Sequence, residues 1–181
     1  MKVNKFRLVQ LNNPYELEKL GISVFKNLDF EDLRGSLKVL FEGSIDTDEK
    51  FISYKSSSSL PNVSRGLHYQ SSPYHQKKII NVSQGSILDV VYNVKDEQQT
   101  MYMVELKSSD NLSIEIPGGF AHGFLSLDEV KFNYICFGEY SENHETTFNV
   151  FPSIANLLNL SKPIMSTKDS SFPEISVALE C

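Results

Sequence analysis

From residue 36 onward, the chain alternates between short apolar segments and clusters of Gly, Asn, Asp and Ser. Apolar segments of about four to eight residues, separated by turn residues roughly every 8 to 12 positions, are typical of strands in antiparallel sandwiches and barrels. The strands we expect are residues 6–11, 36–41, 50–55, 63–70, 77–83, 86–94, 100–106, 112–116, 123–126 and 130–137. The sequence therefore predicts an all-β fold.

Two short helices are expected, one near each end of the chain. Pro14 suits the first helical position, Asn13 can cap the first turn, and Gly21 can end the helix after about Leu20. Near the C-terminus, apolar residues recur with helical spacing within residues 153–163, where a proline stops the pattern.

Length and composition predict one domain over residues 1–181. A chain of 181 residues with 40% apolar content can form one substantial core. The serine run at 56–59 is expected to be a loop within that domain. No apolar stretch approaches the roughly 18 residues of a membrane helix, and the N-terminus lacks a secretory signal pattern. We therefore expect a cytoplasmic protein.

The charge balance of the chain favours a small anionic ligand over nucleic acid. A net charge of −6 and a pI of about 5.2 disfavour binding to the phosphate backbone of nucleic acid, which needs a basic face on the protein. Only three arginines are present, and Arg34 and Arg65 each precede a glycine within an apolar segment. These two cations suggest a ligand such as a diphosphate, while ordinary ion pairs are the alternative interpretation.

Residues 65–70, RGLHYQ, place a cation and a titratable imidazole in one short strand. An imidazole can move protons at neutral pH, so His68 is a candidate base, although a structural histidine is the commoner case. Strict strand alternation would point Arg65 and His68 to opposite faces. A bulge at Gly66, or an arginine that reaches the ligand from the strand edge, would bring them together.

Other candidate groups lie on neighbouring strands. Gln76 and Lys78 share one strand face, and Tyr134 shares a face with Phe132 and Cys136. Singly, the lysine would point to water and the tyrosine would pack in the core. An imidazole, an ammonium and a phenol that converge on one cavity would instead supply a base, an oxyanion stabiliser and an acid without a metal or organic cofactor.

Residues 117–122 match half of a metal-cupin pattern, PxGxxH, which would offer His122 as a metal ligand. The other half should supply an HxH pair with a following acid, but His68 is followed by Tyr69 and Gln70. A metal ion would be short of ligands unless His75 or His144 contributed. We therefore expect a cavity without a metal.

Seven short motifs in this order and spacing resemble those of the dTDP-4-dehydrorhamnose 3,5-epimerases and their nucleotide-sugar relatives. The motifs are RGLHYQ at 65–70, QKKII at 76–80, GSILDV at 85–90, IPGGFAHGFLSL at 116–127, FNY at 132–134, EYS at 139–141 and STKD at 166–169. The resemblance covers residues 32–173. It implies a cupin-like jelly-roll barrel and a homodimer.

The resemblance also implies a role for each candidate residue. His68 corresponds to the catalytic base, Asp169 to the carboxylate that orients it, Tyr134 to the acid across the sugar ring, and Lys78 to the cation near the C4 oxygen. The expected substrate contacts are Arg65, Arg34, Gln76, His122 and Tyr140, with the two arginines on the diphosphate and Arg34 reaching a neighbouring subunit's site.

The implied activity is a cofactor-independent epimerisation at C3, C5 or both of a nucleotide-linked 4-keto sugar, hence an isomerase. Protons beside the C4 ketone are acidic because their removal gives an enolate. The alternatives are a metal-dependent cupin enzyme and a sugar-nucleotide binding module without turnover.

The chain departs from the family where the nucleotide base should be read. Aromatic residues and a glutamate usual after the first Arg-Gly are replaced by residues 36–39, a Gln/Asn pair is replaced by Ser53 and Lys55, and the chain has no tryptophan. These departures favour a GDP-linked 4-keto heptose over a dTDP-linked sugar, in the synthesis of bacterial surface polysaccharide.

Overall fold

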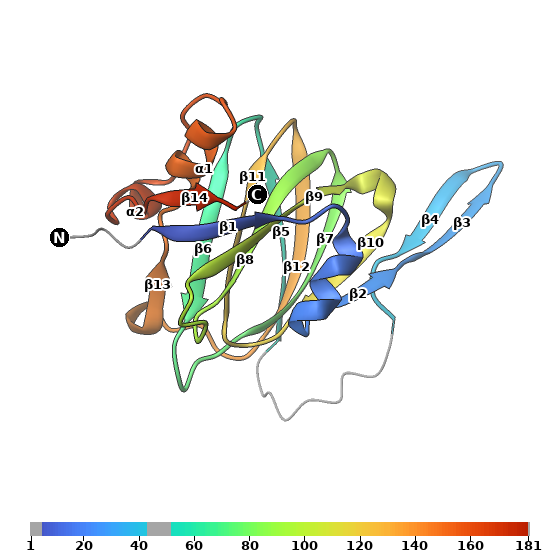
Figure 1. Cartoon of the computed structure of the whole chain (residues 1–181). Helices are drawn as coiled ribbons and strands as arrows, with labels where there is room; N and C mark the ends of the chain where they lie inside the picture. The colour runs from blue at the N-terminus through green and yellow to red at the C-terminus, as the bar shows by residue number, and fades with distance from the viewer. Residues whose placement is uncertain (1–4, 43–51, 181) are drawn as a thin grey trace.

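Two β-sheets face each other in the computed structural model, which describes residues 5–42 and 52–180 (Figure 1). The seven-stranded sheet has the order β13 (Glu145–Thr147), β6 (Ser64–Gln70), β11 (Phe120–Ser126), β8 (Ser86–Asn93), β9 (Thr100–Lys107), β1 (Phe6–Gln10) and β14 (Val177–Leu179). The five-stranded sheet has the order β2 (Ser23–Lys26), β10 (Leu112–Ile116), β7 (Lys77–Gln84), β12 (Val130–Phe137) and β5 (Ile52–Ser59). The prediction of an all-β, cupin-like jelly roll is confirmed.

The strand predictions differ from the structure mainly at the edges of the sheets. Strands β2, β13 and β14 were not expected, nor was β3 (Leu28–Asp32) outside the two sheets. Strand β1 runs parallel to both β9 and β14 rather than antiparallel. Residues 50 and 51 of the strand expected at 50–55 lie outside the described residues. The edge strands were missed because three or four residues carry too little periodicity to be recognised.

The serine run at 56–59, expected to be a loop, is the second half of β5. Strand β5 pairs with β12 from Ile52 opposite Phe137 to Ser59 opposite Val130. The backbone hydrogen bonds that β12 offers to β5 do not depend on side-chain type. Pairing with β12 therefore outweighs the preference of serine for turns and loops. The prediction was therefore wrong, and the serines belong to the wall of the sandwich.

Two apolar clusters hold the fold together, one on each face of the seven-stranded sheet. Between the sheets, buried residues of β8 such as Ile87 and Val91 pack with Ile80 of β7 and Phe132 of β12. On the outer face, alternate residues of β8 pack under helix α1 (Phe151–Leu157). Strand β8 is apolar on both faces because both are covered.

The helices are short. The predicted N-terminal helix is the 3₁₀ segment η1 (Pro14–Leu20), whose first turn is capped by Asn13 and which ends at Gly21 with a positive φ. Helix α1 confirms the predicted C-terminal helix. The one-turn helix α2 (Thr167–Ser170) and the 3₁₀ turns η2 (Ser108–Asp110) and η3 (Glu142–His144) were not predicted. No helix in residues 5–42 or 52–180 is long and apolar enough to span a membrane.

A hairpin of β3 (Leu28–Asp32) and β4 (Gly35–Val39) projects away from the two sheets (Figure 1). Arg34 lies in its turn, where its guanidinium is exposed and bonds to the Asp32 carboxylate, with Nε 3.1 Å from Oδ1. The ion-pair interpretation therefore describes Arg34 within this chain, and the hairpin carries it away from the cavity described below.

Candidate active site

One cavity between the sheets brings most of the predicted residues together. Its volume is about 480 Å³, within the usual range for ligand pockets. Seven of the nine predicted residues line it, namely Arg65, His68, Lys78, His122, Tyr134, Tyr140 and Asp169. Arg34 and Gln76 do not line it; the Gln76 side chain donates to the Gly138 carbonyl at 3.0 Å.

A bulge in β6 turns Arg65 and His68 into the same cavity. His68 lies opposite His122 on β11, and Arg65 lies opposite Phe124, so β6 takes three residue steps where β11 takes two. Residues directly opposite in a sheet point to the same face, and His122 and Phe124 share a face of β11. The bulge at Gly66 is therefore the alternative that the structure supports.

The bulge depends on two glycines that face each other. Gly66 has a φ of 100°, and a Cβ there would lie 2.7 Å from the His122 carbonyl oxygen. A Cβ on Gly123 would collide with the Arg65 carbonyl oxygen. A side chain is excluded at Gly66 by its positive φ and the close backbone approach, and at Gly123 by the close approach alone.

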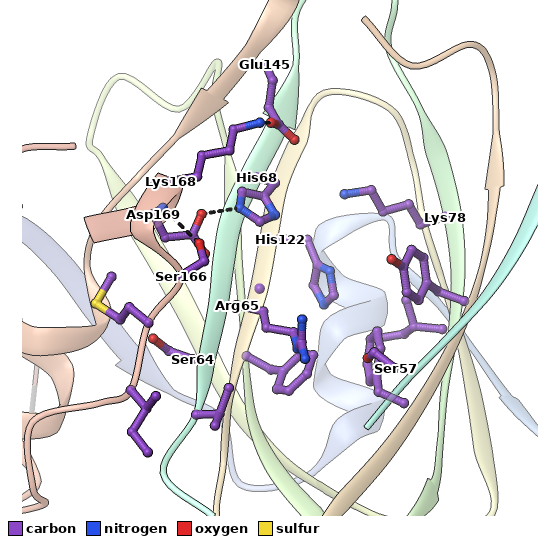
Figure 2. A pocket seen from close by; sticks show the side chains of 18 of the residues that line it. Ser57, Ser64, Arg65, His68, Lys78, His122, Glu145, Ser166, Lys168 and Asp169 are labelled. Carbon is purple, nitrogen blue, oxygen red and sulfur yellow. Dashed lines mark hydrogen bonds and ion pairs between the residues drawn. The ribbon is translucent and has the colours of Figure 1, made fainter. Parts of the chain in front are cut away.

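The His68 imidazole is held by a buried carboxylate from α2. Its Nε2 lies 2.7 Å from Oδ1 of Asp169, whose other oxygen lies 3.4 Å from the Gly66 N–H (Figure 2). Burial by itself would raise the pKa of Asp169, but the hydrogen bonds from His68 and Gly66 outweigh burial and hold that pKa below its usual value. Asp169 is thus ionised at neutral pH.

An ionised carboxylate only accepts hydrogen bonds, so Nε2 of His68 must carry the proton in this contact. In the neutral ring, Nδ1 is then the nitrogen with the free lone pair. The Asp169 partner fixes this tautomer and stabilises the imidazolium that forms when Nδ1 takes up a proton. The pair has the arrangement of a general base with its orienting group.

Lys78 of β7 points across the cavity toward His68 from the opposite sheet (Figure 2). Burial lowers the pKa of the Lys78 ammonium, and nearby Lys55 adds to this, while the negative field of Glu145 opposes it. An ammonium in such a site is placed to stabilise negative charge that develops on a ligand oxygen.

Tyr134 of β12 lines the same wall of the cavity. Cys136 pairs with Lys78 on the neighbouring strand β7, and Tyr134, two residues before Cys136, is therefore a diagonal neighbour of Lys78 on the same face of the sheet. Burial raises the pKa of the Tyr134 phenol, and the nearby Arg65 guanidinium opposes that shift. The phenol therefore keeps its proton at neutral pH and can donate it as an acid.

A second imidazole–carboxylate pair lies deeper in the sandwich. Nε2 of His122 is 2.7 Å from Oδ1 of Asp89, and both side chains are buried. The His122 ring stacks on Phe132, with ring centroids 6.1 Å apart. His122 thus presents one ring edge to the cavity from a fixed position, which suits a substrate contact.

Arg65 has hydroxyl and carbonyl partners rather than a carboxylate. Its guanidinium donates to Ser59 Oγ at 3.0 Å and to the Ser58 carbonyl at 3.1 Å. Within the described residues it makes no ion pair, so its charge is available to a ligand. In the same described part, the buried hydroxyls of Ser57 and Ser64 line the cavity without a hydrogen-bond partner.

Several cavity residues escaped the sequence analysis. These are Ser57, Ser64, Glu145, Ser166 and Lys168, together with Asp89 behind His122. Ser57 was expected in a loop, Ser64 lay within the strand expected at 63–70, and Ser166 belongs to the STKD motif. Lys168 stands beside Asp169 in the STKD motif, which was the one available signal.

The part of the chain that the structure describes contains no set of side chains that could bind a metal ion. No group of three or more His, Cys, Asp or Glu side chains lies close enough there to bind an ion. His68 and His122 each bond to a different carboxylate. The two cavity histidines are therefore each engaged in a dyad.

Known proteins share both the sequence pattern and this architecture. The model of the family described as dTDP-4-dehydrorhamnose 3,5-epimerase matches residues 16–176. The chain is 30% identical over 167 residues to the dTDP-4-dehydrorhamnose 3,5-epimerase of Shigella flexneri, which covers 87% of this chain and 92% of that protein.

Solved structures of the same family resemble this fold closely. The structure of dTDP-4-dehydrorhamnose 3,5-epimerase from Sulfolobus tokodaii has a TM-score of 0.71 and 33% identity, and covers 86% of this chain and 90% of its own. The enzyme from Bacillus anthracis with TDP and PPi bound has a TM-score of 0.70 and 25% identity, with coverage of 85% and 94%. The chain therefore belongs to the dTDP-4-dehydrorhamnose 3,5-epimerase family, whose members are carbohydrate isomerases.

Proposed function

We propose that this protein epimerises a nucleotide-diphosphate-linked 4-keto sugar at C3, at C5 or at both, without a cofactor. One observation carries the proposal: a base, His68 of the seven-stranded sheet, lines the same cavity of about 480 Å³ as an ammonium and a phenol of the five-stranded sheet, Lys78 and Tyr134. Arg65, at the same cavity, supplies the charge for a diphosphate. Family membership supports the same reaction class.

The proposed reaction begins with loss of a proton from a carbon beside the C4 ketone. Nδ1 of His68 accepts that proton, and the C–H electron pair moves to form an enolate with its charge on the C4 oxygen. Lys78 stabilises the enolate, because its ammonium is held in a partly buried site where charge interactions are strong.

The second step returns a proton to the same carbon from the opposite face. The Tyr134 phenol donates it, the enolate electrons form the new C–H bond, and the ketone is restored with the carbon inverted. His68 then holds one extra proton and Tyr134 lacks one. Exchange of both groups with water resets the site, so each turnover introduces a proton from solvent.

The identity of the nucleotide in the substrate is a separate part of the proposal. Relatives named for dTDP sugars support thymidine, while the changes at residues 36–39, Ser53 and Lys55 support a different base. We propose a GDP-linked 4-keto sugar of the heptose type, since these departures are confined to the positions expected to read the base and leave the cavity residues in place.

Incubation with 4-keto sugars in deuterated water tests the activity and the nucleotide together. We expect deuterium at C3, C5 or both, with a higher kcat/KM for a GDP-linked than for a dTDP-linked ketone. A higher value for the dTDP-linked ketone would retain the epimerase and reject the GDP assignment. Binding that stabilises the protein against heat without any exchange would instead identify a binding module.

We also propose that the protein acts as a homodimer through the β3–β4 hairpin. Leu28 pairs with Val39 and Phe30 pairs with Leu37, so one face of the hairpin is apolar while Asp29 and its neighbours make the other face charged. The side chains of Leu28, Phe30, Leu33 and Leu37 are exposed in the single chain. A two-stranded hairpin with an exposed apolar face needs a partner surface, and a second copy can supply one reciprocally.

In such a dimer, Arg34 would serve the partner's cavity, which a mixing experiment can detect. Arg34→Ala should raise KM, and His68→Asn should remove activity. Refolding the two variants together should restore about a quarter of the wild-type activity, because half of the dimers are mixed and one of their two sites is complete. Activity that never exceeds the mean of the separate variants would reject the shared site.

A further inference from the structure

The carboxylate that orients His68 is carried by a helix too short to hold itself in place. Helix α2 comprises only four residues, and helices of one turn have unfavourable nucleation in water. Ser166 caps the turn by accepting the Asp169 N–H at 3.0 Å. The position of Asp169 must therefore come from contacts between this turn and the rest of the fold.

Asp169 and Lys168 anchor the turn in two directions. Asp169 bonds to His68 and to the Gly66 N–H of β6. Lys168, the preceding residue, donates to the Glu145 carboxylate and, at 3.2 Å, to the Tyr140 hydroxyl, which itself donates to Glu145 at 3.1 Å. Neighbouring helical residues point about 100° apart, so the two anchors restrain different motions of the turn.

Both anchors join α2 to the same corner of the seven-stranded sheet. Glu145 begins β13, which pairs with β6 so that Glu145 lies opposite Gln70 and Thr147 lies opposite His68. Figure 2 shows the Lys168–Glu145 contact beside the His68–Asp169 contact at the cavity. A shift of α2 away from β13 would thus lengthen the bond to His68.

The Glu145 side chain is only 12% exposed, so its contact with Lys168 is better shielded than an ordinary surface ion pair. The hydrogen bonds to Glu145 and Tyr140 raise the pKa of Lys168, which keeps its ammonium charged throughout the working pH range. Removal of one partner would leave the other charge uncompensated at the cavity edge.

We infer that Lys168 and Glu145 are positioning residues for the reaction: their ion pair holds α2 against β13 and so keeps Asp169 on His68. The inference rests on the proposed function for its kinetic consequence. A misplacement of the base by about 1 Å can cost about a hundredfold in rate, so loss of the pair should lower kcat by about ten- to a hundredfold.

Lys168→Met tests the inference against wild-type exchange activity. We expect the stated loss in kcat with KM within about twofold of wild type, a similar loss in Glu145→Gln, and recovery in Lys168→Arg, which keeps the charge and the donor. Glu115→Gln is the matched control, because Glu115 pairs with Lys77 at 3.7 Å away from the cavity. That variant should retain full activity.

A double-mutant cycle with Asp169→Asn separates positioning from substrate contact. If Lys168 acts through Asp169, adding Lys168→Met to Asp169→Asn should cost nothing further. The same fold-loss in both backgrounds, or no loss in Lys168→Met alone, would overturn the inference.

A nitrogen-15 spectrum of His68 needs no substrate. It should show one Nε2–H tautomer in the wild type and a mixture in Lys168→Met, whereas an unchanged single tautomer would reject the anchoring role. An absence of exchange in the wild type would reject the proposed function alone.

Discussion

Replacement of His68 with asparagine is expected to abolish solvent exchange at the sugar while the protein still folds. Asparagine nearly fills the volume of the imidazole and can donate to Asp169, but it has no basic nitrogen to replace Nδ1. General-base catalysis contributes about a hundred- to ten-thousandfold to a proton transfer, so kcat for exchange should fall by at least about a hundredfold. The measurement is deuterium incorporation followed by NMR, with thermal unfolding as the check on folding.

His75→Asn is the matched control for this variant. His75 Nδ1 lies 3.0 Å from the Gln70 carbonyl, and His75 does not line the cavity. An asparagine amide can replace that donor, so exchange should remain within about twofold of wild type. Exchange at the wild-type rate in His68→Asn would show that another group removes the proton and would reject the assigned base.

Replacement of Lys78 with methionine is expected to be the next most damaging change. Methionine preserves most of the length and removes the charge, so the enolate oxygen loses its stabilising cation. Loss of one such group typically costs about a hundred- to a thousandfold in kcat. The loss should appear in kcat more than in KM, because the enolate charge exists only after proton transfer.

The pH profile supplies a second readout for Lys78. Since burial lowers the pKa of this ammonium, its charge is lost at a lower pH than in a free lysine, and exchange should fall on the alkaline side. Lys78→Arg should move that fall to higher pH, because a guanidinium stays charged. Lys77→Met, on the neighbouring position that pairs with Glu115, is the control, and an equal loss there would point to general destabilisation.

Much of the cavity lining was predictable, because candidate residue types recur at fixed spacing in the motifs that resemble the epimerase family. His68, Lys78 and Tyr134 lie on long strands whose apolar neighbours reveal them, and the structure places all three at one cavity. Asp169 was identified through the family resemblance, since α2 is one turn long and leaves no periodic signal.

The relation between Arg65 and His68 was not predictable from alternation alone. The bulge that aligns them requires the close approach of Gly66 and Gly123, which are distant in sequence and meet only when β6 pairs with β11. A glycine inside a strand marks such a bulge but does not say which neighbours it redirects.

Other errors arose where tertiary partners decide the outcome. The serine run of β5 is a strand because β12 supplies backbone partners along its whole length. Strand alternation would place Gln76 on the same face as Lys78, two residues later. Gln76 lies before β7 begins, however, and its side chain donates to the Gly138 carbonyl instead of lining the cavity. The ion pair of Lys168 and Glu145 joins elements whose proximity no local pattern reveals.

The extra residue in β6 also offers a criterion for sorting genome sequences of this family. Arg65 and His68 reach one cavity only because the strand gains a step between them. A homologue with a deletion or an insertion in that interval would turn one of the two outward, even if every catalytic residue type were retained in an alignment. Segment length between the arginine and the histidine is therefore as informative as their identity when an epimerase is distinguished from a catalytically silent relative.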